Sequence, residues 1–177
     1  NSSEAREVEL TSYGELVLAP PEADRAHPAF GNLFVETEWH AWCGAITATR
    51  RPRSAQEPAP WCVHVAATGR ERVGEVTCET DRARFLGRGR STRDPMALER
   101  DGPLSMTTGA VLDPIVSIRQ TVVIRPGESV QVDIVTGAAE SRDGVEALAE
   151  KYHDASLTDR VFDLAWTHGN ILLQQLN

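Results

Sequence analysis

The feature that most constrains the fold is a two-residue alternation of apolar and polar side chains along the first 140 residues. Such alternation is typical of half-buried β-strands, in which successive side chains point to opposite faces. The predicted strands lie within residues 8–19, 33–46, 61–68, 73–80, 116–124 and 130–136. The 73–80 pattern is the weakest of these. We therefore expect a mainly β chain that folds as an antiparallel β-sandwich.

Turn-forming residues separate these strands and suggest how they connect. Pro126-Gly127 suits the two central positions of a type II turn, because proline presets φ and glycine accepts a positive φ. We expect this turn to join residues 116–124 and 130–136 as a hairpin. Residues 87–109 form a stretch without a strand pattern, and a loop of that length is commonly functional or disordered.

The pattern changes to helical spacing near residue 141. Asp143 followed by Glu146 resembles a capping box, and residues 145–152 then place apolar side chains on one helical face. A second helix is expected from Ser156, apolar over so much of its circumference that it needs a covering partner. These patterns predict a β-sandwich domain at 1–140 and a helical linker at 141–177. The first methionine is Met96, so we expect a piece of a larger protein.

The stretch "DRARFLGRGR", Asp81 to Arg90, gathers cations in a chain whose formal net charge is −8. Guanidinium groups bind carboxylate or phosphate as a bidentate fork, and glycine lets the backbone approach a ligand closely. Two interpretations stay open. The arginines are either a solvated loop paired with some of the 26 acidic residues, or a surface for a ligand or a neighbouring domain.

Several classes of function are disfavoured by the same composition. The negative net charge opposes nucleic-acid binding. No apolar run approaches the ~20 residues of a membrane span, and the N-terminus lacks the apolar core of a signal peptide. The three cysteines (Cys43, Cys62, Cys78) lack metal-binding spacing and are expected to be buried thiols. The five histidines show no ligand spacing, so we predict neither a metal nor a cofactor.

Two other side-chain patterns have a structural as well as a functional explanation. Carboxylate pairs, which glycosidases require, occur at Glu36/Glu38 and at Glu79/Asp81, but such pairs are common on solvated strand faces. Tryptophans, which stack on sugar rings, occur at positions 39, 42, 61 and 166. Core packing explains most tryptophans, although Trp42 alternates to the face opposite Trp39 and one of the two is expected to be exposed.

Four stretches carry a family resemblance: "ELTSYGELVLAPPEADRAHPAFGNLFVETEW", "ETDRARFLGRGR", "GAVLDPIVSIRQTVVIRPGESV" and "EALAEKYHD". They resemble the β-sandwich region of the inverting glycoside phosphorylases that include cellobiose and chitobiose phosphorylases. The resemblance is strongest toward the phosphorylase-like part of bacterial cyclic β-1,2-glucan synthetases. It covers the chain after residue 3, and Asp81–Arg90 is its most specific part.

This resemblance implies a galactose-mutarotase-like super-sandwich, of which the chain would be a part, followed by linker helices and an (α/α)6 catalytic barrel. The catalytic aspartate of such proteins lies on the barrel, so no catalytic residue is assigned here. In relatives a sandwich loop lies near the active-site entrance, often toward a neighbouring protomer. By resemblance, Arg84, Arg88 and Arg90 are candidate substrate-binding residues, and Phe85 is their packing anchor.

The function that the resemblance implies is a non-catalytic, carbohydrate-binding type of domain within a cyclic β-1,2-glucan synthetase. Its parent would make glucan from a sugar nucleotide and control chain length by phosphorolysis. The expected partners are β-1,2-glucan or its oligosaccharides, the catalytic barrel of the same chain, and a second copy as a homodimer. The expected location is the cytoplasmic side of the bacterial inner membrane. A purely structural scaffold and the sandwich of a stand-alone β-glucan phosphorylase are the alternatives.

Overall fold

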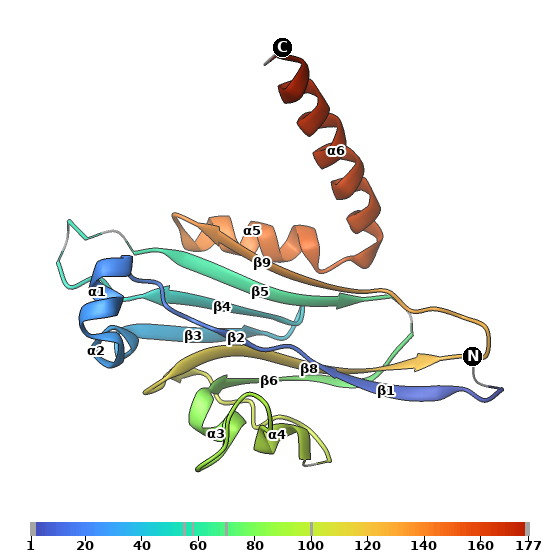
Figure 1. Cartoon of the computed structure of the whole chain (residues 1–177), viewed down its shortest axis with the longest axis horizontal. Helices are drawn as coiled ribbons and strands as arrows, with labels where there is room; N and C mark the ends of the chain where they lie inside the picture. The colour runs from blue at the N-terminus through green and yellow to red at the C-terminus, as the bar shows by residue number, and fades with distance from the viewer. Residues whose placement is uncertain (1–2, 55, 58, 70, 100, 176–177) are drawn as a thin grey trace.

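The computed structural model describes residues 3–54, 56–57, 59–69, 71–99 and 101–175, and shows two antiparallel sheets packed face to face (Figure 1). The first sheet has four strands: β1 (Arg6–Thr11) and β2 (Gly14–Glu15) along one edge of β8 (Pro114–Ile124), and β6 (Arg72–Asp81) along the other. The second runs in the order β7 (Gly109–Ala110), β3 (Val35–His40), β4 (Ala45–Arg50), β5 (Trp61–Thr68) and β9 (Val132–Ala139). The predicted β-sandwich is confirmed.

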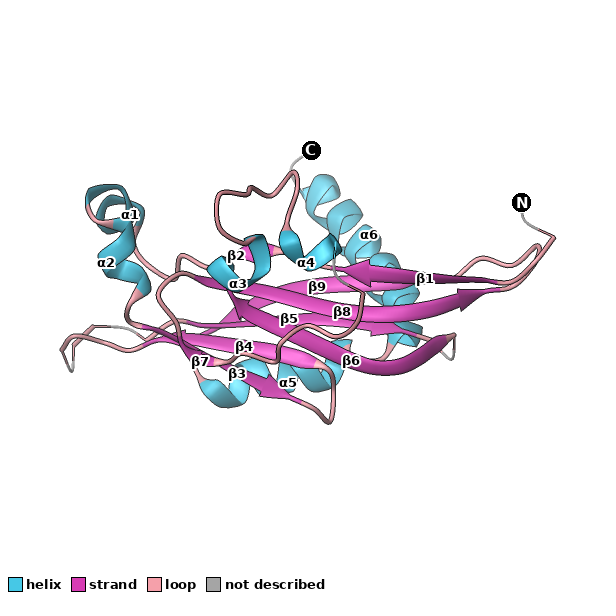
Figure 2. Ribbon diagram, turned by 90° about the horizontal axis from the view of Figure 1, so that it is seen from below, coloured by secondary structure: helices cyan, strands magenta, loops and turns pink. Residues whose placement is uncertain are grey.

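Helices cover the outer faces of this sandwich. The helical segments are α1 (Pro21–Ala26), α2 (Pro28–Asn32), α3 (Arg82–Leu86), α4 (Met96–Glu99), α5 (Arg142–Tyr152), the 3₁₀ turn η1 (Ala155–Leu157) and α6 (Thr158–Gln175). In Figure 2, viewed from below, α3 and α4 lie in front of β6 and β8. The opposite outer face, on the five-stranded sheet, is covered by α5 (Figure 1).

Three apolar clusters hold these layers together. The central one joins the inner faces of the two sheets through the buried side chains of Leu16, Val35, Ile46, Ala48, Cys62, Ala66, Cys78, Val116 and Ile118. The second packs Val145 and Ala149 of α5 against Val63 and Val65 of β5. The third lies under α3 and α4. All three cysteines are buried as predicted, and desolvation raises the pKa of Cys62 to about 11 and that of Cys78 to about 12.

A polar link also crosses the interface between the sheets. His64, on β5, lies between the Ser12 hydroxyl at Nε2 and the Thr136 hydroxyl at Nδ1, each at 2.9 Å. Ser12 Oγ in turn accepts a hydrogen bond of 2.9 Å from the amide of Ile118 on β8. Burial lowers the pKa of His64 to about 4, so its imidazole is neutral at pH 7.

The predicted turn at Pro126-Gly127 forms, but the predicted hairpin does not. Gly127 has a φ of +77°, and the amide of Glu128 donates to the carbonyl of Arg125 at 3.0 Å, as a type II turn requires. The strands on either side separate, however, because β8 belongs to the four-stranded sheet and β9 pairs with β5. This turn therefore carries the chain from one sheet to the other.

The single strand expected at residues 33–46 is instead β3 followed by a turn and the start of β4. The chain turns at Ala41–Gly44, where Gly44 has a φ of +65°, and β4 returns beside β3. His40 Nε2 lies 2.8 Å from the Thr47 hydroxyl and links the two strands. The alternation of β3 continues only as far as the turn, so Ala41 and Trp42 are exposed while Cys43 is buried.

The two C-terminal helices are predicted correctly in kind but differ in detail. Ser141, rather than Asp143, caps α5, because its hydroxyl accepts from the amide of Gly144 at 3.2 Å. The 3₁₀ turn η1 precedes α6, which projects away from the sandwich (Figure 1). Phe162, Leu164 and Trp166 on α6 are exposed, so the expected apolar surface is present. The division into domains at residue 140 stays a prediction.

Candidate functional site

The arginine segment, residues 81–93, leaves the end of β6 and begins as a helix rather than as the expected loop. Asp81 caps α3, and its Oδ1 accepts from the amide of Ala83 at 2.9 Å. Gly87 ends the helix with a φ of +84°. A Cβ at this glycine would lie 2.8 Å from Cβ of Met96, so the residue supplies both the turn and the close approach of the following chain.

Apolar packing anchors the arginine segment on the outer face of the four-stranded sheet. Phe85 and Leu86 of α3 are buried against Leu104 and Ile115, as predicted for Phe85. The Tyr13 ring packs on Phe85 with a centroid distance of 5.0 Å. Because the anchor is fully packed, the backbone of α3 is held in place while its outward side chains remain at the surface.

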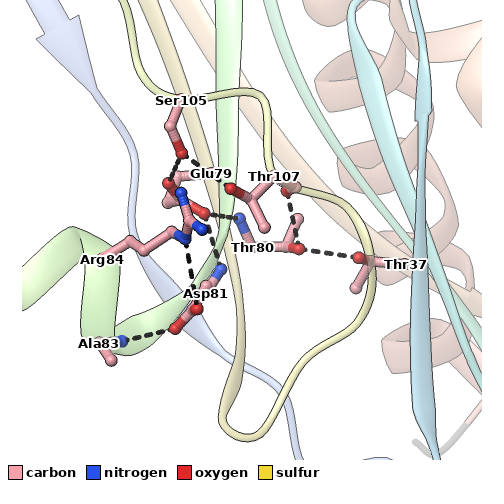
Figure 3. A network of polar contacts seen from close by, with 8 residues as sticks. All are labelled: Thr37, Glu79, Thr80, Asp81, Ala83, Arg84, Ser105 and Thr107. Atoms are coloured by element: carbon pink, nitrogen blue, oxygen red, sulfur yellow. Dashed lines mark hydrogen bonds and ion pairs between the residues drawn. The ribbon is translucent and has the colours of Figure 1, made fainter.

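A buried carboxylate fixes the point where β6 turns into α3 (Figure 3). Glu79 accepts hydrogen bonds from the amides of Thr80 at 3.0 Å and Asp81 at 2.9 Å, and from the Ser105 hydroxyl. Thr80 Oγ1 is 2.8 Å from the hydroxyl of Thr37 on the other sheet. Glu79 is thus saturated by local donors and Asp81 by its capping role. This arrangement favours a structural role for the Glu79/Asp81 pair over acid–base chemistry.

Arg119 of β8 connects the four-stranded sheet to α4 and the loop after it, a role that the sequence did not predict. Its side chain is 5% exposed and donates to the carbonyls of Ala97 at 2.6 Å and Gly102 at 2.8 Å. It also bonds Thr11 and pairs with Glu9. A buried arginine with this many acceptors joins the loop after α4 to the sheet. No local pattern points to it, because the acceptors come from distant parts of the chain.

Two of the three predicted site residues have acidic partners within the chain. Arg90 pairs with Glu99 at 2.6 Å and lies 3.8 Å from Asp94, and the Glu99 hydrogen bond raises the pKa of Arg90. Arg84 lies 3.7 Å from Asp81 but is 62% exposed. These pairs match the interpretation of a solvated segment paired with the acidic residues of the chain.

Arg88 differs from both of them. Its side chain is exposed and makes no hydrogen bond or ion pair with any of the described residues. It sits between Gly87 and Gly89, both with positive φ. The structure therefore places the three predicted residues on one segment and leaves Arg88 as the one of the three most available to a ligand or a neighbouring surface.

A cavity of about 180 Å³ opens beside the arginine segment, lined by Arg84, Phe85, Glu79 and Arg119 among others. Small-molecule sites commonly enclose about 300–1,000 Å³. The cavity is smaller than that range, so a sugar ring would need a second surface to enclose it.

The other residues considered from the sequence have mainly structural positions. Glu38 is exposed and pairs with Arg142 at 2.8 Å. His40 and His64 are buried, and each makes a side-chain hydrogen bond. Among the described residues, no group of three or more histidines, cysteines or carboxylates is arranged to hold a metal ion. Nor does any described helix combine the length and apolarity needed to cross a membrane.

With this geometry in view, comparison with known proteins identifies the family. Residues 1–155 match the family described as glycosyl hydrolase 94, supersandwich domain. The chain belongs to this family. The match spans all nine strands and α5, so the predicted resemblance is confirmed.

A curated relative of this supersandwich domain is the cyclic beta-(1,2)-glucan synthase NdvB of Rhizobium meliloti (strain 1021). The two are 34% identical over 174 residues, which is 98% of this chain and 6% of that protein. The chain therefore corresponds to a small part of its relative, and it is a supersandwich domain homologous to part of a glucan synthase.

Proposed function

We propose that this chain is a non-catalytic, carbohydrate-binding type of domain that supports the synthesis of β-1,2-glucan and the phosphorolytic control of its chain length. The observation that carries the proposal is the similarity to a cyclic beta-(1,2)-glucan synthase along 98% of the chain. The proposed parent is a glycosyltransferase and inverting glycoside phosphorylase on the cytoplasmic side of the bacterial inner membrane.

In this proposal the arginine segment forms one wall of a composite site, and a catalytic barrel of the same parent forms the other. The small volume of the cavity beside Arg84 supports a shared site, because the sandwich alone encloses too little space. Arg88 is exposed, has no acidic partner among the residues that the structure describes, and is suited to bind a sugar hydroxyl or a phosphate. Arg84 and Arg90 set the charge and shape of the segment around it.

The test is Arg88→Ala in the full-length parent, with glucan turnover as the readout. Loss of a charge-assisted hydrogen bond is worth about 1.5–3 kcal/mol, so we expect turnover to fall about 10- to 100-fold. Arg88→Lys keeps the charge but loses the fork and should fall in between. The matched control is Arg125→Ala, at the β8–β9 turn, where a second exposed arginine is replaced. Equal turnover in all four proteins would reject the role of Arg88.

A second candidate function, an interdomain or dimerisation scaffold, is favoured by α6. Phe162 is 69% exposed and Trp166 is 75% exposed, and a soluble domain seldom exposes such side chains together without a partner. If the scaffold is the whole function, Phe162→Ser with Trp166→Ser would disrupt assembly of the parent while Arg88→Ala leaves turnover unchanged.

A further inference from the structure

A second cavity, of about 480 Å³, lies at the end of the sandwich where the β3–β4 turn meets the start of β6. We call it the tryptophan cavity, and its lining includes Trp39, Trp42, Thr68, Arg72, Glu75 and His153. Its volume falls within the range of about 300–1,000 Å³ that small-molecule sites commonly have. It shares no lining residue with the cavity beside the arginine segment.

Two indole rings line this cavity in different ways. Trp39 is half-buried and packs on the central apolar cluster, so its position is set by the core. Trp42 is 59% exposed in the turn after β3. The rings of His153 and Trp42 meet in a T-shaped contact with a centroid distance of 5.9 Å and an interplanar angle of 69°. This contact orients Trp42 without covering it, and an exposed, oriented indole offers a flat apolar face.

Polar groups stand beside that face. Arg72 and Glu75 are exposed, and neither side chain makes a hydrogen bond or ion pair with the described residues. His153 donates through Nδ1 to the carbonyl of Glu150 at 2.6 Å, and its Nε2 has no hydrogen bond to any described residue. The cavity therefore offers donors from a guanidinium, acceptors from a carboxylate and an imidazole nitrogen. This balance suits a neutral ligand with many hydroxyl groups better than an anion.

The backbone at this cavity departs from regular geometry at two places. The pairing of β6 with β8 shifts register between Val73 and Thr77, and Gly74 within the shift has a φ of +70°. Met106, also in the lining, is a non-glycine residue with a φ of +57°. Bulges redirect side chains and often lie beside binding sites, as do residues in unfavourable backbone regions.

We propose that the tryptophan cavity binds a glucose ring of a β-linked glucan chain, with the ring's C–H face against Trp42 and its hydroxyls on Arg72, Glu75 and His153. The partial positive charge of sugar C–H groups complements the negative face of the indole. The inference rests on the proposed function for the class of sugar. It adds a holding site for glucan that is separate from the arginine segment.

The experiment titrates this chain with linear β-1,2-linked gluco-oligosaccharides and follows tryptophan fluorescence and heat of binding. We expect saturable binding, weakened about tenfold by Trp42→Ala, since a stacked aromatic contact is worth up to about a factor of ten. Trp42→Phe should recover part of the affinity. The matched control is Trp166→Ala, which removes a more exposed tryptophan from α6 and should leave the affinity unchanged.

The second variant, Glu75→Gln, keeps the shape of an exposed side chain and should weaken binding without touching the aromatic face. No binding by the unaltered chain at millimolar sugar would overturn the inference. So would binding that survives Trp42→Ala but is lost in Arg88→Ala, which would move the sugar to the arginine segment and leave the proposed function intact. The proposed function has its own readout, the turnover of the full-length parent.

Discussion

The arginine segment and the tryptophan cavity both present charged side chains at the surface, but they differ in whether those side chains have partners within the chain. In the arginine segment, Arg84 and Arg90 have carboxylate partners, and Phe85 anchors the backbone beneath them. In the tryptophan cavity, the side chains of Arg72 and Glu75 have no hydrogen-bond or ion-pair partner among the described residues. The comparison shows that arginines clustered in the sequence can be largely neutralised by nearby carboxylates. Residues scattered along the sequence can instead come together around a cavity with their charged groups unpaired.

The largest expected change in stability comes from removing the apolar anchor of the arginine segment. Phe85→Ala should lower the free energy of unfolding by about 3–5 kcal/mol, because it empties the packed volume under α3. Chemical denaturation measures the loss, and Phe162→Ala is the matched control, since Phe162 is 69% exposed on α6. A loss below about 1 kcal/mol for Phe85→Ala would show that the segment does not depend on its anchor.

Acid should weaken both regions together, because His64 lies between the two sheets that carry them. Burial lowers its pKa from 6.5 to about 4, so the unfolded chain binds the proton more readily than the folded chain. The stabilising effect of the neutral imidazole is complete above pH 6.5 and is lost as the pH falls through 4. The loss between pH 7 and 4.5 is roughly 2–3 kcal/mol.

The measurement compares urea unfolding at the two pH values in the unaltered chain and in His64→Asn. The variant removes the imidazole of His64 and keeps the contributions of the other titratable groups, so its pH dependence should be smaller. His153→Asn, at an exposed histidine, is the control. If His64→Asn kept the pH dependence of the unaltered chain, the loss of stability in acid could not be attributed to protonation of His64.

A smaller effect concerns the start of α3. Asp81→Ala should cost about 1 kcal/mol, because the Ala83 amide loses its capping acceptor. Asp81→Asn keeps an acceptor and should cost only a few tenths of a kcal/mol. Hydrogen exchange at the α3 amides reports the change directly. Equal protection in the alanine variant would mean that packing at Phe85 holds the helix without its cap.

The smallest expected change in stability is at the tryptophan cavity. Trp42→Ala should change the free energy of unfolding by no more than about 0.5 kcal/mol, because the side chain is 59% exposed. Thermal unfolding followed by far-ultraviolet circular dichroism measures it. A loss above about 1.5 kcal/mol would make Trp42 a packing residue and remove the distinction between the two regions.

The alternation of side chains predicted the strand-forming regions, but β4 was not separated from β3. Residues of β4 are buried on both faces, since one face meets the other sheet and the other meets α5. A strand covered on both sides loses the alternation that identifies it. For the site, the sequence predicted Arg84, Arg88 and Arg90 on one segment. It did not show which of them would form ion pairs with carboxylates of the chain. The decisive partner of Arg90 is Glu99, on the separate helix α4.

The turn at Pro126-Gly127 and the helical character of residues 142–152 follow from the sequence alone, because each depends on a residue and its near neighbours. Long-range packing places β8 and β9 in different sheets, brings Arg119 to the chain after α4, and brings Trp42 to His153. An apolar strand face suits either sheet equally well. The choice between them is made by the packing of the whole core, which joins residues far apart in the sequence.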